Sequence, residues 1–221
     1  MKSRQEIKAL AKEAMKEQRG TSILLVVMFL VWSIIISIVS FFLRDQALLG
    51  TLLGLAFSFF MIVWGINTYG AFIKVYKREQ TSVGDVAADL KVNPLRKIGG
   101  TFWLALWYML WSLLFVIPGI IKFFSYYFTP NILADCPNVT ARQALKISMR
   151  MTQGHKGKIF VFALSWIGWF LLSSLTLGIL YIVYVGPYWY AADAGYYIEL
   201  RDNAIEEGRI TREELGMEYP V

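Results

Sequence analysis

Cysteine and histidine are almost absent from this chain: Cys136 and His155 are the only ones among its 221 residues. One cysteine cannot close a disulfide within the chain, and one histidine cannot supply the clusters that hold zinc. Charged residues are also scarce, at 17% of the chain, whereas 57% of the residues are hydrophobic. The composition therefore excludes a disulfide framework and a histidine-rich metal site, and the apolar runs become the informative feature.

These apolar runs are long enough to cross a membrane. Residues 21–43 carry no charge, and at ~1.5 Å per residue they reach ~34 Å, enough for a ~30 Å hydrocarbon core. The run follows a charged segment and lacks a small-residue cleavage site, so we expect a retained helix and not a removed signal peptide. The predicted spans are 21–43, 47–73, 99–117, 120–136, 159–176 and 179–200.

Lysine and arginine are sorted into the segments between the runs. Of the 22 basic residues, 20 lie in polar stretches and two, Arg44 and Lys122, lie elsewhere. The four stretches are 1–20, 74–98, 137–158 and 201–221. Basic segments beside spans stay on the cytoplasmic side. The sorting predicts that both termini are cytoplasmic and that little of the chain lies outside.

The run at 120–136 contains Lys122, Asn131 and Asp135 and is poor as an isolated membrane helix. If it did not cross, the basic stretch after it would face outside, against the charge rule. We therefore expect a short helix kinked at Pro130 and sheltered by its neighbours. Turns are predicted at Pro118–Gly119 and Leu177–Gly178, and a kink at Gly186–Pro187.

The expected fold is all-α: a polytopic membrane bundle of about six helices in three hairpins, with amphipathic helices at the cytoplasmic surface. Residues 140–153 show the pattern best, because Thr140 and Gln143 have capping-box spacing and one face is apolar. Residues 3–18 repeat it and 81–92 fit it least well. Three such units predict an internal repeat. Residues 1–200 would form one membrane domain and 201–221 a solvated cytoplasmic tail.

Basic side chains on these surface segments are candidates for contact with lipid headgroups, because amphipathic basic helices bind anionic leaflets. They are Lys8, Lys12, Lys16, Arg142, Lys146 and Arg150. The alternative is that the segments simply pack on the bundle. The basic residues form no nucleic-acid motif, so the expected partners are anionic membrane lipids. A stripe of small residues, Gly50, Gly54 and Ser58, favours internal helix packing over an oligomer interface, and a homo-oligomer or a partner membrane protein stays compatible with it.

Asp193 lies within the sixth predicted span, where a charged residue costs about 2.5–3.5 kcal/mol. Asn67 and Asn131 occupy similar depths on the returning helices of the first and second hairpins. The three side chains would converge into a polar site for a cation, a proton or a headgroup amine. The alternative, hydrogen bonding between helices, is the favoured interpretation.

No arrangement of residues indicates catalysis. Proteolysis within the membrane needs a serine–histidine pair, paired aspartates or a metal motif inside the spans, and His155 lies in a loop. We therefore predict a protein that is not an enzyme, with no catalytic residues, no metal site and no cofactor.

Several segments resemble a bacterial integral membrane family known only as domain of unknown function 975. The resemblance is carried by Ile117, Pro118, Gly119, Ile120, Ile121 and Lys122, by Ala134, Asp135, Cys136 and Pro137, and by Gly154, His155, Lys156, Gly186, Pro187 and Tyr188. It implies a multispan protein of the bacterial plasma membrane and assigns no activity. The expected function is lipid interaction in envelope homeostasis or protection; the alternatives are a small transporter or channel and an accessory subunit of a larger assembly.

Overall fold

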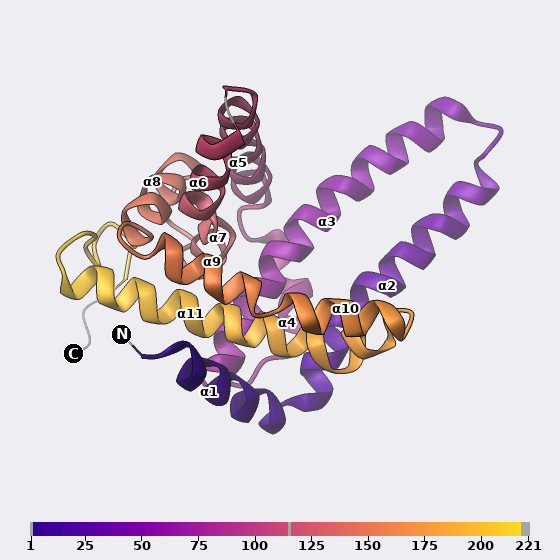
Figure 1. Cartoon of the computed structure of the whole chain (residues 1–221). Helices are drawn as coiled ribbons and strands as arrows, with labels where there is room; N and C mark the ends of the chain where they lie inside the picture. Colours follow the sequence, from indigo (N-terminus) through magenta and orange to yellow (C-terminus); the bar gives the residue numbers. More distant parts are fainter. Residues whose placement is uncertain (1, 115, 218–221) are drawn as a thin grey trace.

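A computed structural model describes residues 2–114 and 116–217, and within these the chain is helical and contains no strand (Figure 1). The helices in order are α1 (Arg4–Glu17), α2 (Arg19–Phe42), α3 (Ala47–Tyr76), α4 (Val83–Ala88), α5 (Pro94–Leu114), α6 (Val116–Tyr126), α7 (Thr129–Asp135), α8 (Ala141–Met151), α9 (Lys156–Leu164), α10 (Ile167–Leu175) and α11 (Gly186–Glu206). A 3₁₀ turn, η1 (Asp89–Lys91), follows α4, and a π-helical segment, η2 (Tyr181–Val185), precedes α11. The all-α prediction is confirmed.

Three hairpins project from the body of the molecule, formed by α2 with α3, α5 with α6, and α9–α10 with η2 and α11 (Figure 1). Their tips point away from the side on which the two chain ends lie. Among the described residues, three segments are long and apolar enough to cross a membrane: Arg19–Phe42, Ala47–Tyr76 and Lys156–Leu175. The six-span arrangement stays a prediction.

A short capped helix precedes each hairpin. Helix α1 begins with a capping box between Ser3 and Glu6, and α8 with the predicted box between Thr140 and Gln143. The segment that fitted the repeat least well, α4, also begins with a box, formed by Ser82 and Asp85. In each box the hydroxyl accepts a hydrogen bond from the third backbone N–H, which satisfies a donor that the first turn leaves free. The recurrence supports three related units.

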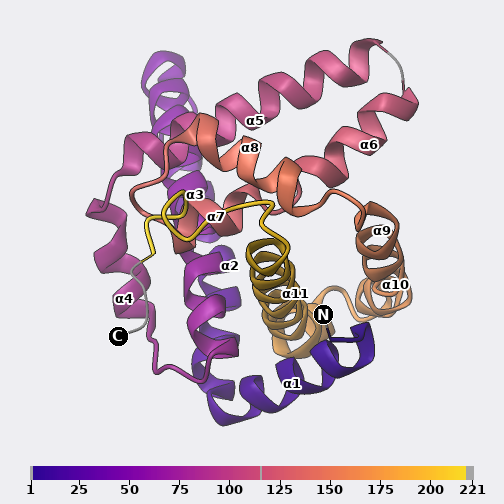
Figure 2. The same ribbon diagram turned by 90° about the vertical axis from the view of Figure 1, so that its left-hand side faces the viewer.

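These surface helices pack in a cyclic order. Helix α4 packs on α3, α8 packs on α5 and α7, and α1 packs on α11. Each therefore rests on the hairpin that precedes it in the cycle, and α1 closes the circle. In Figure 2, where α11 is seen nearly end-on, α1, α4 and α8 lie on three sides of it.

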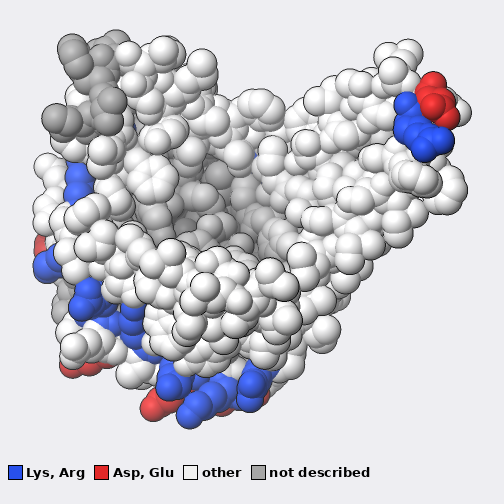
Figure 3. Space-filling view, turned by 45° about the vertical axis from the view of Figure 1, so that its right-hand side comes forward, with Lys and Arg blue, Asp and Glu red and all other residues white. Residues whose placement is uncertain are grey.

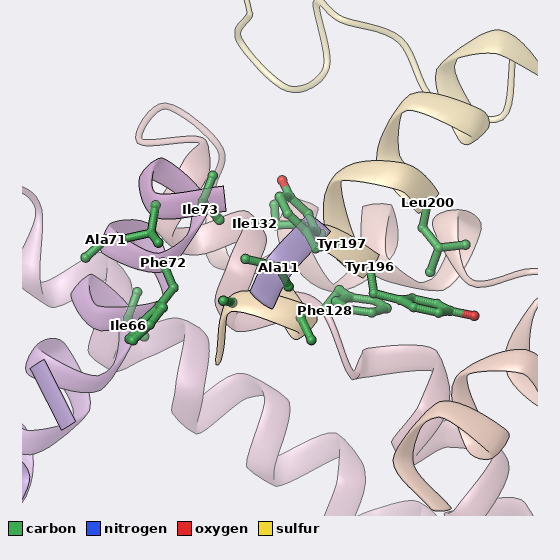
Figure 4. Close-up of a cluster of buried hydrophobic side chains, with 14 of the residues drawn as sticks. Ala11, Ile66, Ala71, Phe72, Ile73, Phe128, Ile132, Tyr196, Tyr197 and Leu200 are labelled. Carbon is green, nitrogen blue, oxygen red and sulfur yellow. The ribbon is translucent and has the colours of Figure 1, made fainter. Parts of the chain in front are cut away.

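The core lies where α11 meets α1, α3 and α7. Phe128 stacks on Tyr196 with ring centroids 6.2 Å apart and an interplanar angle of 8° (Figure 4). Gly195 permits the close contact with α3, because a Cβ there would lie 2.2 Å from the ring of Tyr76. Its helix neighbour Ala191, four residues earlier, is also buried, so this pair of small residues marks a close-packed face of α11.

The predicted single helix at 120–136 is wrong. The chain forms two helices, α6 and α7, that are separated by a turn at Tyr127 and Phe128. Pro130 stands in the first turn of α7, where its missing N–H costs nothing. In a continuous helix its ring would collide with the carbonyl of Tyr126, so the proline begins a new helix instead of bending an old one.

The turn predicted at Pro118–Gly119 is also displaced, because both residues lie inside α6. Gly119 instead lets α6 approach α5: a Cβ there would lie 3.0 Å from Ser112 Oγ and 3.1 Å from Ser112 Cα. Residue 115, within the predicted span 99–117, lies outside the described residues. The turn at Leu177–Gly178 is confirmed, with φ of 50° and 84°. The irregularity expected near Gly186–Pro187 is present as η2.

The C-terminal segment departs from the predicted solvated helix. Helix α11 continues through residue 200 to Glu206, and the chain then turns back against α8. Ile210 and Leu215 are buried there. Arg209 donates to the backbone carbonyls of Arg150 and Met151 at the end of α8, because the last carbonyls of a helix lack partners within it. Residues 218–221 lie outside the described residues.

The small-residue stripe on α3 does not pack inside the chain. A Cβ on Gly54 would meet nothing within 4 Å, and one on Gly50 would meet only the carbonyl of Leu43 at 3.8 Å. Ser58 is exposed and donates to the carbonyl of Gly54 one turn earlier. The interpretation of this stripe as an internal packing surface is therefore wrong: the hairpins splay, and among the described residues the part of α3 near the hairpin tip lies beside α2 (Figure 1).

Candidate functional site

Two of the three predicted polar residues meet. Asn131 Nδ2 on α7 donates to Asp193 Oδ2 on α11 at 3.0 Å, and both side chains are buried. Asn131 lies in the first turn of α7, which begins at Thr129, and its side chain reaches α11 from there. An uncharged donor on a carboxylate reduces the cost of burying it, but supplies no countercharge.

Asn67 does not join this pair. Its Nδ2 donates to the carbonyl of Val86 at the end of α4 at 3.0 Å, and its Oδ1 accepts from Lys97 Nζ at 2.6 Å. Lys97 also donates to the carbonyl of Asp89 at 3.0 Å. Burial lowers the pKa of Lys97, and the charge of Asp89 offsets part of that effect. Asn67 thus anchors α4 and the start of α5 to α3.

A cavity of about 340 Å³ lies beside Asp193. Its walls come from α3, α5, α6, α7 and α11, and they are almost entirely aromatic apart from the carboxylate; they include Tyr69, Tyr108, Tyr127, Trp189 and Asp193. A carboxylate among aromatic faces is an arrangement suited to a cation, because ring faces carry negative partial charge. The cavity is the part of the structure in which Asp193 could meet a ligand.

A second polar cluster joins α7 to α11. Arg201 Nη1 donates to Asp135 Oδ2 at 2.7 Å, and the hydroxyl of Tyr197 donates to the same oxygen at 2.9 Å. Lys77 Nζ at the end of α3 lies 3.8 Å from Asp135 Oδ1. Arg201 also donates to Asp202 Oδ1 from Nε and Nη2. This cluster joins the ends of α3 and α7 to α11.

The six predicted headgroup residues divide into two groups. Lys12, Lys16, Arg142 and Lys146 are exposed. Lys8 is half-buried: its Nζ donates to Ser165 Oγ at 2.8 Å and lies 4.1 Å from the centroid of the Trp166 ring. Arg150 pairs with Glu214 at 2.9 Å. Lys8 and Arg150 therefore hold the surface helices in place, and the other four side chains are exposed.

A groove of about 430 Å³ lies between α5, α6 and α8, and α8 crosses both other helices in Figure 2. We call it the tryptophan groove; it is lined by Trp103, Trp107, Trp111, Lys122, Tyr126, Arg142, Leu145, Lys146 and Met149. The three tryptophans share a face of α5 because they are four residues apart. Lys122 Nζ lies 4.6 Å from the centroid of the Trp111 ring.

Charge and apolar surface are separated on the folded molecule. In the view of Figure 3, lysine and arginine gather along the lower and left edges of the body, and the hairpins show little charge apart from the tip of the α2–α3 hairpin. Lys122 lies on α6 of the second hairpin. At that tip Arg44 Nε lies 3.8 Å from Asp45 Oδ2. Large apolar side chains on the hairpins are exposed, among them Phe42, Leu113 and Leu175. The sorting along the sequence is thus a sorting in space.

The sequence did not indicate Asp135, Lys97 or Arg201 as parts of internal polar clusters. Each lies at the border of a predicted span, where a charge is unremarkable. A signal for Asp135 and Arg201 would have been their position at the inner ends of two returning helices, which the hairpin model brings together. The groove was not foreseen either, although the tryptophan spacing on one face was visible.

The family comparison agrees with the resemblance seen in the sequence. Residues 95–204 match a family described as protein of unknown function (DUF975). No curated protein and no solved structure matches the chain. The matched segment runs from the start of α5 almost to the end of α11, so it contains the tryptophan groove and the Asn131–Asp193 pair. Through residues 95–204 the chain is a member of the DUF975 family of proteins of unknown function.

Proposed function

We propose that this chain is a non-enzymatic, lipid-interacting protein of the bacterial plasma membrane that serves envelope homeostasis or protection. The observation that carries the proposal is the separation in Figure 3: exposed apolar hairpins on one side and a basic edge on the other. A basic edge beside an apolar surface suits the anionic headgroups of a cytoplasmic leaflet. Both described ends of the chain pack against this edge, Lys2 on Glu199 and the C-terminal segment on α8.

The proposed topology has six crossings, arranged as three hairpins that enter from the cytoplasm. Three segments support it by their length and apolarity. Helices α5 and α6 pack on each other as the second hairpin, and η2 with α11 returns the third. Exposed leucines on α5, including Leu106, Leu110 and Leu113, suit a lipid environment better than water.

Single cysteines would test this topology in a Cys136→Ala background. We expect an impermeant maleimide to label Gln46→Cys and Leu177→Cys, at two hairpin tips, on intact cells. Lys12→Cys and Arg142→Cys, on α1 and α8, should react only after permeabilisation. Labelling of the surface positions from outside, or protection of the tips, would contradict the arrangement.

Lipid preference is testable in bilayers of equal phosphatidylglycerol and phosphatidylcholine. We expect brominated phosphatidylglycerol to quench tryptophan fluorescence more than brominated phosphatidylcholine does. In cells, substitution of Lys12, Lys16, Arg142 and Lys146 by Gln should remove any tolerance to cationic membrane-active peptides that the wild-type chain confers. Equal quenching by the two lipids would refute the lipid function.

The Asp193 cavity favours one second candidate, a small transporter or channel for a cation. Asp193 is a buried carboxylate for which the described residues supply no basic partner, and it lines a cavity of about 340 Å³; a cation bound there would replace the missing countercharge. The test is flux of Na⁺, K⁺ and H⁺ into proteoliposomes, with Asp193→Asn as the variant, since Asn keeps the shape and removes the charge. Wild-type flux equal to that of protein-free vesicles would exclude this candidate.

A further inference from the structure

We propose that the tryptophan groove is a binding site for one anionic phospholipid, with the phosphate held by Lys122, Arg142 and Lys146 and an acyl chain laid against the tryptophans. The inference rests on the proposed lipid function and assigns it a site. It depends on three features of the groove: unpaired positive charge, an apolar wall continuous with the hairpin surface, and a neighbouring basic recess.

Lys122 carries the charge argument. It is one of two basic residues outside the polar stretches, and the other, Arg44, has Asp45 beside it. Within the described residues no carboxylate pairs with Lys122, Arg142 or Lys146. Lys122 lies over the rings of Trp111 and Tyr126, and a ring face attracts a cation without neutralising it. Three basic side chains around one groove therefore call for an anion.

The other wall determines what kind of anion fits. Trp103 and Trp107 contact each other edge to face at 5.8 Å, and they lie with Trp111 along about 12 Å of α5. Tryptophan is favoured at membrane interfaces, where its ring meets chains and its N–H meets headgroups. A soluble inorganic anion would leave this aromatic wall uncovered, whereas a lipid covers it.

The groove also opens toward lipid. Leu106 and Leu110, which lie beside the tryptophans on α5, are 48% and 45% exposed. An acyl chain leaving the groove would continue over this surface and remain in the hydrocarbon region. The volume of about 430 Å³ lies within the range of small-ligand sites and accommodates a headgroup with the upper part of a chain.

A second recess of about 250 Å³ shares Lys122 and Met149 with the groove. Its other lining residues are Ser125, Arg150, Gln153 and Lys156, so it is polar and basic. None of the three tryptophans lines this recess, and it gives the polar end of a headgroup a place. The order of apolar wall, lysine and polar recess matches the order of chain, phosphate and headgroup in a phospholipid.

Lipid titration in neutral detergent micelles would test the site, because such micelles lack the diffuse potential of an anionic leaflet. The probe is brominated phosphatidylglycerol, read by quenching of tryptophan fluorescence. The wild-type chain should bind it saturably and bind brominated phosphatidylcholine far more weakly. Since each basic contact to an anionic headgroup contributes roughly fivefold, the triple variant K122Q/R142Q/K146Q should bind about 100-fold more weakly.

The matched control is R19Q/K91Q/K158Q, which removes the same charge from exposed positions that lie outside both the groove and the predicted headgroup contacts. It should bind within about twofold of the wild-type chain, given that roughly fivefold is expected only for direct contacts. K122R/R142K/K146R keeps every charge and should also bind, which separates loss of charge from loss of fold. In W103F/W107F/W111F the quenching at saturation should fall although circular dichroism is unchanged.

The outcomes distinguish the site from the broader function. If groove and control variants lose equal affinity, attraction is diffuse and the groove proposal is overturned, while the lipid function stands. If the wild-type chain does not discriminate between the two lipids in bilayers or micelles, the lipid function fails as well. Displacement of the lipid by millimolar glycerol phosphate would assign the groove to a soluble phosphate and would also overturn the proposal.

Discussion

Removing Asp135 should destabilise the fold strongly, because Arg201 Nη1 and the Tyr197 hydroxyl on α11 lose the acceptor that they share. The side chains of Asp135 and Arg201 are 10% and 9% exposed, so solvent screens their pairing little. Removing one member of a buried pair costs about 3–5 kcal/mol. Arg201 keeps Asp202 as a partner in Asp135→Ala, which places the expected loss near the lower end, about 3 kcal/mol.

The assay is equilibrium unfolding in mixed micelles titrated with SDS and followed by tryptophan fluorescence. The double variant D135A/R201M should lose less than the sum of the single variants, by about 2 kcal/mol, because each single change already breaks the shared contact. The control is Arg78→Gln, whose pairs with Glu13 and Glu17 join half-exposed side chains and contribute at most about 1 kcal/mol. A loss in D135A no larger than in this control, or strict additivity in the double variant, would refute the reasoning.

Three further predictions concern single side chains. Burial, with a smaller effect of Arg4, lowers the pKa of Lys8 from 10.5 to about 8. Between these pH values the unfolded chain binds more protons than the folded one, so the free energy of unfolding should rise from pH 8 to 10.5. Parallel curves of unfolding free energy against pH for the wild type and Lys8→Met would contradict this. Gly195→Ala should lower the free energy of unfolding by about 1–3 kcal/mol because its Cβ meets the Tyr76 ring, whereas Gly54→Ala, in open space, should raise it by about 0.5–1 kcal/mol; effects of the same sign would count against this account of the packing. Thr140→Ala should cost about 1 kcal/mol and speed amide exchange in the first turn of α8, and unchanged exchange would show that the cap is redundant.

Local features of the fold could be predicted from the sequence because they depend on neighbours along the chain. The capping box at Thr140 needs only the residue three positions later. The turn at Leu177–Gly178 needs only residues that reach positive φ, and glycine does so without strain. The hairpins follow from apolar runs and the turns between them. Breaks within helices were harder to predict, because Pro130 is compatible both with a kink in one helix and with the start of a new helix.

The destination of polar side chains could not be predicted in the same way. Counting residues gives the depth of Asn67, Asn131 and Asp193 in a span, but not the direction in which each points around its helix axis. Asn131 and Asp193 face each other, whereas Asn67 faces Lys97. The basic residues show the same limit: Arg96 donates to the carbonyls of Leu133, Cys136 and Val139, where α7 ends. Such carbonyls are identifiable only once the helices are in place.

The cyclic packing of the surface helices has a consequence for the order of biosynthesis. Helix α1 leaves the ribosome before the other described helices, whereas α11, on which it packs, leaves after them. At 5–20 residues per second, the interval between them is ~10–40 s. During that interval the buried face of α1, with Ile7 and Ala11, lacks its contacts with α11 and keeps those with α2 and α3. The contact between α1 and α11 forms late, so a chain that lacks either helix loses the same contact.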